Sequence, residues 1–67
     1  MSLAKHIEIT SESKTSFDDA IAGGLDRASE TVKGIRSAWI KDQQVLVESG
    51  KITAYRVNMK VTFMVGS

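Results

Sequence analysis

Residues 52–65 read ITAYRVNMKVTFMV, and their side chains alternate in character along the chain. The apolar series is Tyr55, Val57, Met59, Val61 and Phe63, and the polar residues between them are Arg56, Asn58, Lys60 and Thr62. Successive side chains of a strand point to opposite faces of its sheet, so this pattern predicts a long strand with one buried face. The basic and amide groups on the other face then meet water, a ligand or another subunit.

Two more stretches read as strands. Residues 5–10 alternate, with Ile7 and Ile9 on one side and His6 and Glu8 on the other. In residues 35–48 one face holds Ala38, Ile40 and Leu46, and the other holds Ser37, Trp39, Lys41, Val45 and Val47. A bulge near residues 42–44 would switch these faces. Residues 48–51, with Gly50 at a position of positive φ, predict a hairpin turn to the last strand.

A helix is expected between the first two strands. Ser16 or Thr15 can cap it, because a side-chain oxygen there accepts a bond from a free backbone N–H. An apolar stripe recurs at spacings of three and four, at Phe17, Ile21, Leu25, Ala28 and Val32. Lys33 in the last turn and Gly34 as the terminating glycine mark its expected end. Gly24 lies on the stripe, so we expect it to let a strand approach closely.

The predicted fold is α+β, in the order β-α-β-β, with a three-stranded antiparallel sheet half-wrapping one helix. The 67 residues form a single domain, residues 1–67, and contain no cysteine that could form a disulfide. So small a domain buries only about 60% of its unfolded surface, which favours self-assembly. We expect the sheet face with Trp39, Val45 and Val47 to lie in a subunit interface.

Composition argues against several classes of function. A net charge of +1 does not suggest a nucleic-acid partner. The apolar runs are too short for a membrane span, and the first residues lack the apolar core of a signal peptide, so a cytoplasmic protein without a membrane partner is expected. One histidine and no cysteine exclude a zinc site built from those residues. No nucleophile motif or phosphate loop is present, so an enzyme is not expected.

Three single residues have alternative interpretations. Trp39 is either an interface anchor or a stacking surface for a planar ligand. Arg56 either forms a salt bridge, with Glu48 or Asp42, or binds an anion or an aromatic ring. His6 is either a solvent-facing strand residue next to Glu8 or a group that titrates in a site.

The order of several short motifs resembles the dodecins, small proteins that assemble as hollow dodecamers and of which many bind flavins. The motifs are the first strand at 5–9, the helix start Thr15-Ser16-Phe17, the helix residues Ala20-Ile21, Leu25-Asp26-Arg27-Ala28 and Thr31-Val32, the turn Gly50-Lys51-Ile52, and the last strand with Tyr55-Arg56-Val57 and Val61-Thr62-Phe63. The resemblance covers nearly the whole chain. It implies a homo-dodecamer that binds and stores small molecules of the flavin class.

The resemblance also implies a set of site residues. Flavin-binding dodecins stack the flavin ring on a tryptophan and bond its edge with a glutamine, and these positions fall on Ser37 and Arg56. Asp42 matches a polar flavin contact of the family, and Trp39 lies two residues after Ser37 on the same face. The predicted cofactor-binding residues are therefore Ser37, Trp39, Asp42 and Arg56, with FMN or riboflavin as the ligand. The alternative is a flavin-free structural cage or one that binds ions such as calcium, with unknown metal ligands.

Overall fold

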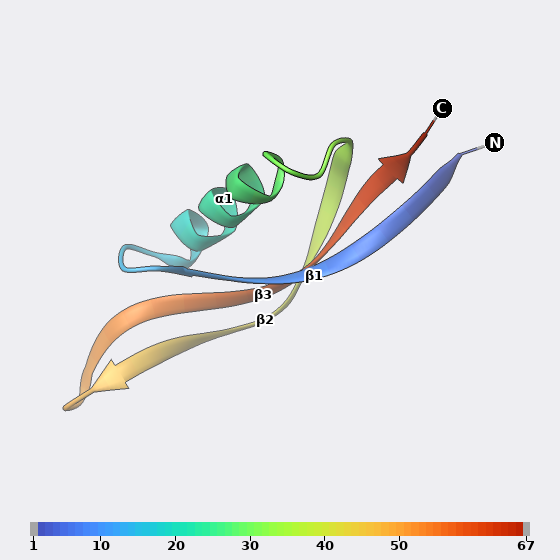
Figure 1. Ribbon diagram of the computed structural model, residues 1–67. Helices are drawn as coiled ribbons and strands as arrows, with labels where there is room; N and C mark the ends of the chain where they lie inside the picture. Colours follow the sequence, from blue (N-terminus) through green and yellow to red (C-terminus); the bar gives the residue numbers. More distant parts are fainter. Residues whose placement is uncertain (1, 67) are drawn as a thin grey trace.

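The computed structural model describes residues 2–66, which form three strands and one helix. These elements are β1 (Leu3–Ser13), α1 (Phe17–Ala28), β2 (Ile35–Glu48) and β3 (Lys51–Val65). The strands form one antiparallel sheet in the order β1-β3-β2, so the last strand of the chain lies in the middle. Figure 1 shows α1 lying over one face of this sheet. The predicted β-α-β-β fold is confirmed.

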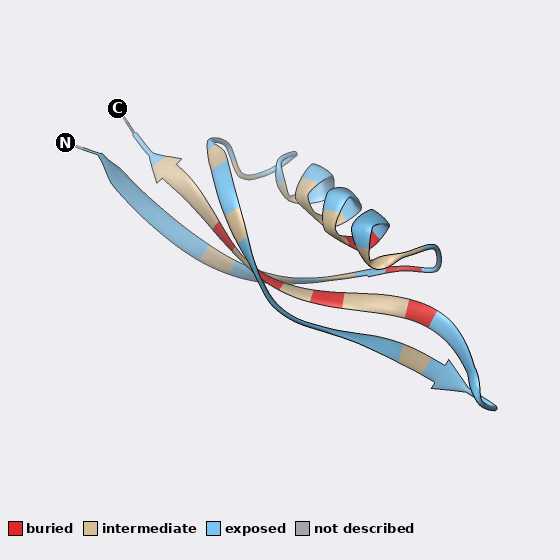
Figure 2. Ribbon diagram, turned by 180° about the vertical axis from the view of Figure 1, so that it is seen from behind, coloured by how far each residue is buried: buried red, intermediate tan, exposed pale blue. Residues whose placement is uncertain are grey.

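The core lies between α1 and the middle strand. Val57, Met59 and Val61 of β3 are fully buried and pack around Ala20 of α1. Burial of each such side chain stabilises the fold by about 1.5–3 kcal/mol. Partly buried apolar residues surround them, namely Ile7, Ile9, Phe17, Ile21, Leu25, Ile35 and Ala38. The apolar residues of β3 thus form the face that packs against the helix. Figure 2 shows the buried segments along β3.

At Gly24 the helix α1 lies very close to the sheet. A Cβ atom at Gly24 would lie 2.7 Å from Ser11 Cβ and 3.0 Å from Met59 Cε, whereas one at Gly23 would meet open space. A carbon–carbon contact of 2.7 Å is well inside the optimal separation of about 3.5–4.0 Å. The expected close approach at Gly24 is confirmed, and Gly23 has no such role.

The start of α1 is held by hydroxyl groups. Ser16 is the N-cap, and its Oγ accepts a hydrogen bond from the backbone N–H of Asp19 at 2.9 Å. Ser13 at the end of β1 donates its Oγ proton to Asp19 Oδ2 at 2.6 Å and accepts from the backbone N–H of Thr15. The bond to Ser16 satisfies a donor that the first helical turn leaves free, and the bonds of Ser13 hold the connection from β1 to the helix. Of the two candidate caps, the structure selects Ser16.

The helix ends earlier than the apolar stripe predicts. Its last residue is Ala28, with Ser29 as the C-cap, rather than a residue near Lys33. Ser29 donates its Oγ proton to the carbonyl of Asp26, and hydroxyl side chains that bond nearby backbone groups compete with helical geometry. Gly34 therefore does not terminate the helix. With φ at +78° it leads the chain into β2, where its carbonyl accepts a bond from Met64 N–H.

A bulge in β2 changes which residues face the helix. The register with β3 shifts between Ile40 and Asp42, which confirms a bulge near residues 42–44. Val45 consequently pairs with Tyr55 on the helix side. The prediction that Val45 shares the face of Trp39 is therefore wrong, because the extra residue reverses the alternation. A second register shift follows between Leu46 and Val47, and Val47 pairs with Ile52.

The hairpin of β2 and β3 extends past the N-terminal end of α1 (Figure 1), and its turn lies at residues 48–51 as predicted. The molecule measures 52 × 19 × 14 Å, so it is an elongated, thin unit. Apolar side chains near the tip stay open to solvent, with Val47 at 57% and Ile52 at 54% exposure. No helix within residues 2–66 is long and apolar enough to cross a membrane.

Candidate functional site

The face of the sheet turned away from α1, which we call the outer face, carries all four predicted site residues. Residues directly opposite each other in an antiparallel pair point to the same face. Because β3 pairs on both sides, its outward residues form rows across the sheet. From β2 through β3 to β1 these rows are Ser37, Thr62 and His6; Trp39, Lys60 and Glu8; Asp42, Asn58 and Thr10; and Gln44, Arg56 and Glu12. Successive rows are about 7 Å apart.

The first two rows bring the aromatic side chains of the outer face together. The ring centroids of His6 and Trp39 are 6.0 Å apart, with the planes tilted by 40°. His6 Nδ1 and Thr62 Oγ1 are hydrogen-bonded at 3.0 Å, and Lys60 Nζ lies 5.7 Å from the centre of the Trp39 ring. Trp39 remains 62% exposed. A large planar surface is thus available beside a cationic side chain.

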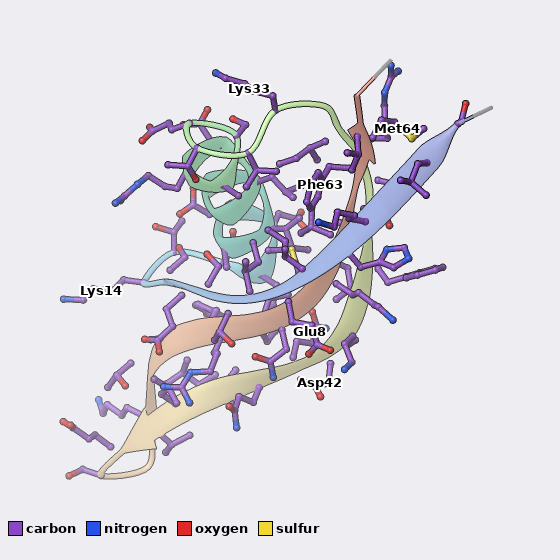
Figure 3. The ribbon with its side chains drawn as sticks, turned by 45° about the vertical axis from the view of Figure 1, so that its right-hand side comes forward. Glu8, Lys14, Lys33, Asp42, Phe63 and Met64 are labelled. Atoms are coloured by element: carbon purple, nitrogen blue, oxygen red, sulfur yellow. The ribbon has the colours of Figure 1, made fainter. Side chains whose placement is uncertain are left out.

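The third row, which we call the central row, is a chain of hydrogen bonds between oxygen-bearing side chains. Thr10 Oγ1 donates to Asn58 Oδ1 at 2.7 Å, and Asn58 Nδ2 donates to Asp42 Oδ1 at 2.5 Å. The bonds fix the orientation of the Asn58 amide between the other two side chains. Figure 3 shows Asp42 and the neighbouring Glu8 on the side of the sheet away from α1. Hydroxyl, amide and carboxylate oxygens therefore lie together at one level of the sheet.

The fourth row engages Arg56. Its Nε donates to Glu12 Oε2 at 2.8 Å, its Nη2 lies 2.6 Å from the same oxygen, and its Nη1 donates to Gln44 Oε1 at 3.2 Å. The interpretation of Arg56 as a salt-bridge residue is confirmed, but the expected partners, Glu48 and Asp42, are wrong. Glu12 takes this role because β1, distant in sequence, lies beside β3. The guanidinium therefore already has carboxylate and amide partners.

The bulge of β2 adds one more cross-strand contact. Lys41, the residue between the two halves of the register, forms a salt bridge with Glu8 of β1, with Nζ and Oε1 3.2 Å apart. Glu8 is therefore paired with a lysine rather than with the neighbouring His6. His6 is exposed, as its interpretation as a surface residue requires, and its hydrogen bond goes to Thr62.

The four predicted site residues are not all within reach of one ligand. Ser37, Trp39 and Asp42 occupy successive rows on β2, whereas Arg56 lies three rows from Ser37, about 20 Å along the sheet. One planar ring on a single subunit cannot touch both ends. Sequence reasoning did not assign His6 and Lys60 to the surroundings of Trp39, although the alternation of β3 already placed Lys60 on this face.

A groove of about 630 Å³ lies elsewhere, between α1 and β1. Its lining includes Ser11, Glu12, Gly23, Gly24 and Arg27, and none of the four predicted site residues. Within residues 2–66 no group of three or more His, Cys, Asp or Glu side chains is arranged to hold a metal ion. A cation on one subunit would therefore need neutral oxygen ligands as well as carboxylates.

Comparison with known proteins gives a consistent match over nearly the full length. The model of the dodecin family matches residues 3–66. The chain is 42% identical over 64 residues to calcium dodecin from Mycobacterium tuberculosis (strain ATCC 25618 / H37Rv), covering 94% of this chain and 89% of that protein. The crystal structure of that calcium-chelating dodecin is similar to this structure with a TM-score of 0.83 and 38% identity, covering 97% and 93% of the two chains.

Other dodecin structures share the fold at lower sequence identity. Dodecin from Streptomyces davaonensis gives a TM-score of 0.93 at 26% identity, covering 98% of this chain and 97% of that one. A mutant of the Thermus thermophilus dodecin gives 0.93 at 21% identity over the full length of both chains. The chain therefore belongs to the dodecin family, whose members are binding proteins rather than enzymes.

Proposed function

We propose that the chain is a calcium-binding dodecin that assembles into a homo-dodecameric shell. The observation that carries the proposal is its 42% identity to calcium dodecin over 94% of its length. Ser37 at the position of the stacking tryptophan, and the engagement of Arg56 by Glu12, also favour a flavin-independent member. The apolar residues exposed near the hairpin tip and at Trp39 support assembly, because an isolated subunit would leave them in water.

The central row offers the ligand chemistry that calcium prefers. Calcium binds six to eight oxygen ligands, including carboxylates and amide carbonyls, at about 2.3–2.6 Å. Asp42 uses Oδ1 to accept from Asn58, and a carboxylate has further acceptor capacity at both oxygens. We infer that Asp42 is a calcium ligand, and that oxygens from a second subunit and from water complete the coordination.

Calcium titration of the assembled protein tests this assignment. Asp42→Asn keeps the shape and an acceptor oxygen but removes the negative charge, and Asp26→Asn makes the same change on the helix. By isothermal titration calorimetry with CaCl₂, the unmodified protein and the Asp26→Asn variant should bind calcium. The Asp42→Asn variant should bind at least about tenfold more weakly, a loss of about 1.4 kcal/mol. Unchanged binding by Asp42→Asn would remove Asp42 from the site, and no binding by the unmodified protein would contradict the function itself.

A second candidate function is the binding of a flavin, FMN or riboflavin, with Trp39 as the stacking surface. The specific observation in its favour is the exposure of Trp39 on the outer face, within two rows of Ser37 and Asp42. Ser37 cannot stack on a ring, and Arg56 presents only donors to a flavin imide N–H. We therefore expect weaker flavin binding than in a member with the tryptophan and the glutamine. Visible absorption spectra of the purified protein, recorded before and after addition of riboflavin or FMN, measure flavin binding.

A further inference from the structure

The charged side chains of the outer face form ion pairs that leave Asp42 out. Glu8 is paired with Lys41, and Glu12 is paired with Arg56. The two glutamates lie in the rows on either side of the central row, and Figure 3 shows Glu8 on the same side of the sheet as Asp42. In the part of the chain that the structure describes, Asp42 is the one carboxylate of the four rows that forms no ion pair. Its negative charge is therefore available to a cation from solution.

The hydrogen bonds of the central row orient Asp42 without neutralising it. Asn58 Nδ2 donates to Asp42 Oδ1 at 2.5 Å, and Thr10 Oγ1 donates to the amide oxygen of Asn58 at 2.7 Å. The amide carries no charge, so the carboxylate stays anionic beside it. Among the described residues no group donates to Asp42 Oδ2. This oxygen is a ligand of the type that calcium prefers.

Lys41 is the cation best placed to neutralise Asp42. It directly precedes Asp42 at the bulge of β2, and its Nζ lies 3.2 Å from Glu8 Oε1 on the outer face. Glu8 lies only one row from Asp42, about 7 Å along the sheet. The Lys41 and Glu8 side chains are 46% and 63% exposed, and exposed ion pairs are weak, so the ammonium can change partner. Arg56, in contrast, is held by both a carboxylate and an amide.

We propose that Glu8 is a positioning residue of the calcium site, because it holds the Lys41 ammonium away from Asp42. An ammonium paired with Asp42 would occupy an oxygen that calcium needs and would cancel the charge that attracts calcium. Glu8 acts through Lys41 and does not itself have to contact the ion. The proposal rests on the proposed calcium-binding function and adds to it a residue that sets the affinity.

A crystal structure of the calcium-free Glu8→Gln variant tests the arrangement without the ion. In this variant Lys41 Nζ should lie within about 4 Å of a carboxylate oxygen of Asp42, which is the distance of an ion pair. In a crystal structure of the unmodified protein the ammonium should stay at Glu8. A variant in which Lys41 extends into solvent, with no pair to Asp42, would overturn the proposal whether or not the protein binds calcium.

A double-mutant cycle measures the consequence for calcium binding. Isothermal titration calorimetry with CaCl₂ compares the unmodified protein, Glu8→Gln, Lys41→Gln and the double variant, at an ionic strength of about 0.15 M, where the Debye length is about 8 Å. Glu8→Gln should weaken calcium binding about three- to fivefold when Lys41 is present, because calcium then competes with an ion pair. In the Lys41→Gln background the same change should cost less than about twofold. Glu30→Gln, which removes a charge on the loop after α1, should leave the affinity unchanged.

The cycle separates the competition by Lys41 from the direct effect of the lost Glu8 charge, since the direct effect is present in both backgrounds. Equal losses of affinity with and without Lys41 would overturn this proposal and leave the calcium-binding function standing. If the unmodified protein binds no calcium, the proposed function fails and the role of Glu8 in it fails as well.

Discussion

Single residues decide how closely the helix and sheet meet. Gly24 is the only α1 glycine in tight contact, since a Cβ there would meet Ser11 and Met59 while Gly23 faces open space. Two glycines in one helix cost about 0.8–1.0 kcal/mol each relative to alanine. At Gly23 no close contact offsets this cost. At Gly24 the absence of a Cβ atom lets α1 pack closely against Ser11 and Met59.

This difference gives a matched pair of variants. Gly23→Ala should raise the free energy of unfolding by about 0.5–1 kcal/mol, because alanine has the higher helix propensity. Gly24→Ala should lower it by about 1–3 kcal/mol, because the added methyl group pushes Ser11 and Met59 apart. Gly24→Val should lower the free energy of unfolding further, because it adds a larger side chain at the same contact. Thermal denaturation at one protein concentration compares them, and a higher midpoint for Gly24→Ala would contradict the close packing.

The two substitutions that separate this chain from flavin-binding dodecins can be reversed. Ser37→Trp combined with Arg56→Gln restores a stacking ring and an amide that both donates and accepts. Riboflavin affinity should rise about two- to twelvefold from the stacking alone, since an aromatic pair contributes about 0.5–1.5 kcal/mol beyond its buried area. Ser37→Trp combined with Arg36→Gln removes the same charge at another position and serves as control. Nanomolar riboflavin binding by the unmodified protein would show that Trp39 already supplies the stacking surface.

At the level of elements, the sequence predicted the strands and their buried faces better than the points where the chain turns. The alternation in residues 52–65 identified the core side of β3 because one face is buried along most of its length. The end of α1 was missed because Val32 continues the apolar spacing, while the hydroxyls that end the helix act through the backbone. The bulge near residues 42–44 was expected, but Val45 was still assigned to the face of Trp39, because the pattern alone does not show which residues lie after the extra one.

The rows of the outer face depend on strand order, which the sequence did not supply. Asn58 bonds both Thr10 and Asp42 only because β3 lies between β1 and β2. The same placement gives Arg56 its partner Glu12, 44 residues away in the chain. The predicted residues Ser37, Trp39 and Asp42 therefore lie on one face as expected. Their neighbours on this face are residues of β3 and β1, which the pairing of strands distant in sequence brings beside them.

The cap of α1 gives a prediction at this level. Ser16→Ala removes the acceptor for the Asp19 N–H and should lower the free energy of unfolding by about 1 kcal/mol. Thr15→Ala, at the alternative cap position, should change it by less than about 0.5 kcal/mol. Chemical denaturation monitored by circular dichroism measures both. Equal losses in the free energy of unfolding for the two variants would contradict the assignment of Ser16 alone as the cap.

At the level of the whole molecule, the shape and the exposed apolar surface both indicate a subunit rather than a free-standing domain. The hairpin extends beyond α1, and Trp39, Val47 and Ile52 are each more than half exposed. The buried core of the single chain consists of a few small and medium-sized side chains. Burial of the hairpin and of Trp39 against further copies would add the apolar area that this thin sheet lacks.

The most direct test of the proposed calcium-binding dodecamer is native mass spectrometry of the purified protein equilibrated with CaCl₂. One spectrum gives the number of chains and the mass of everything bound to them. We predict twelve chains of 7.3 kDa, about 88 kDa, with bound calcium and without flavin. A monomer, or an assembly that carries flavin and no calcium, would contradict the proposal.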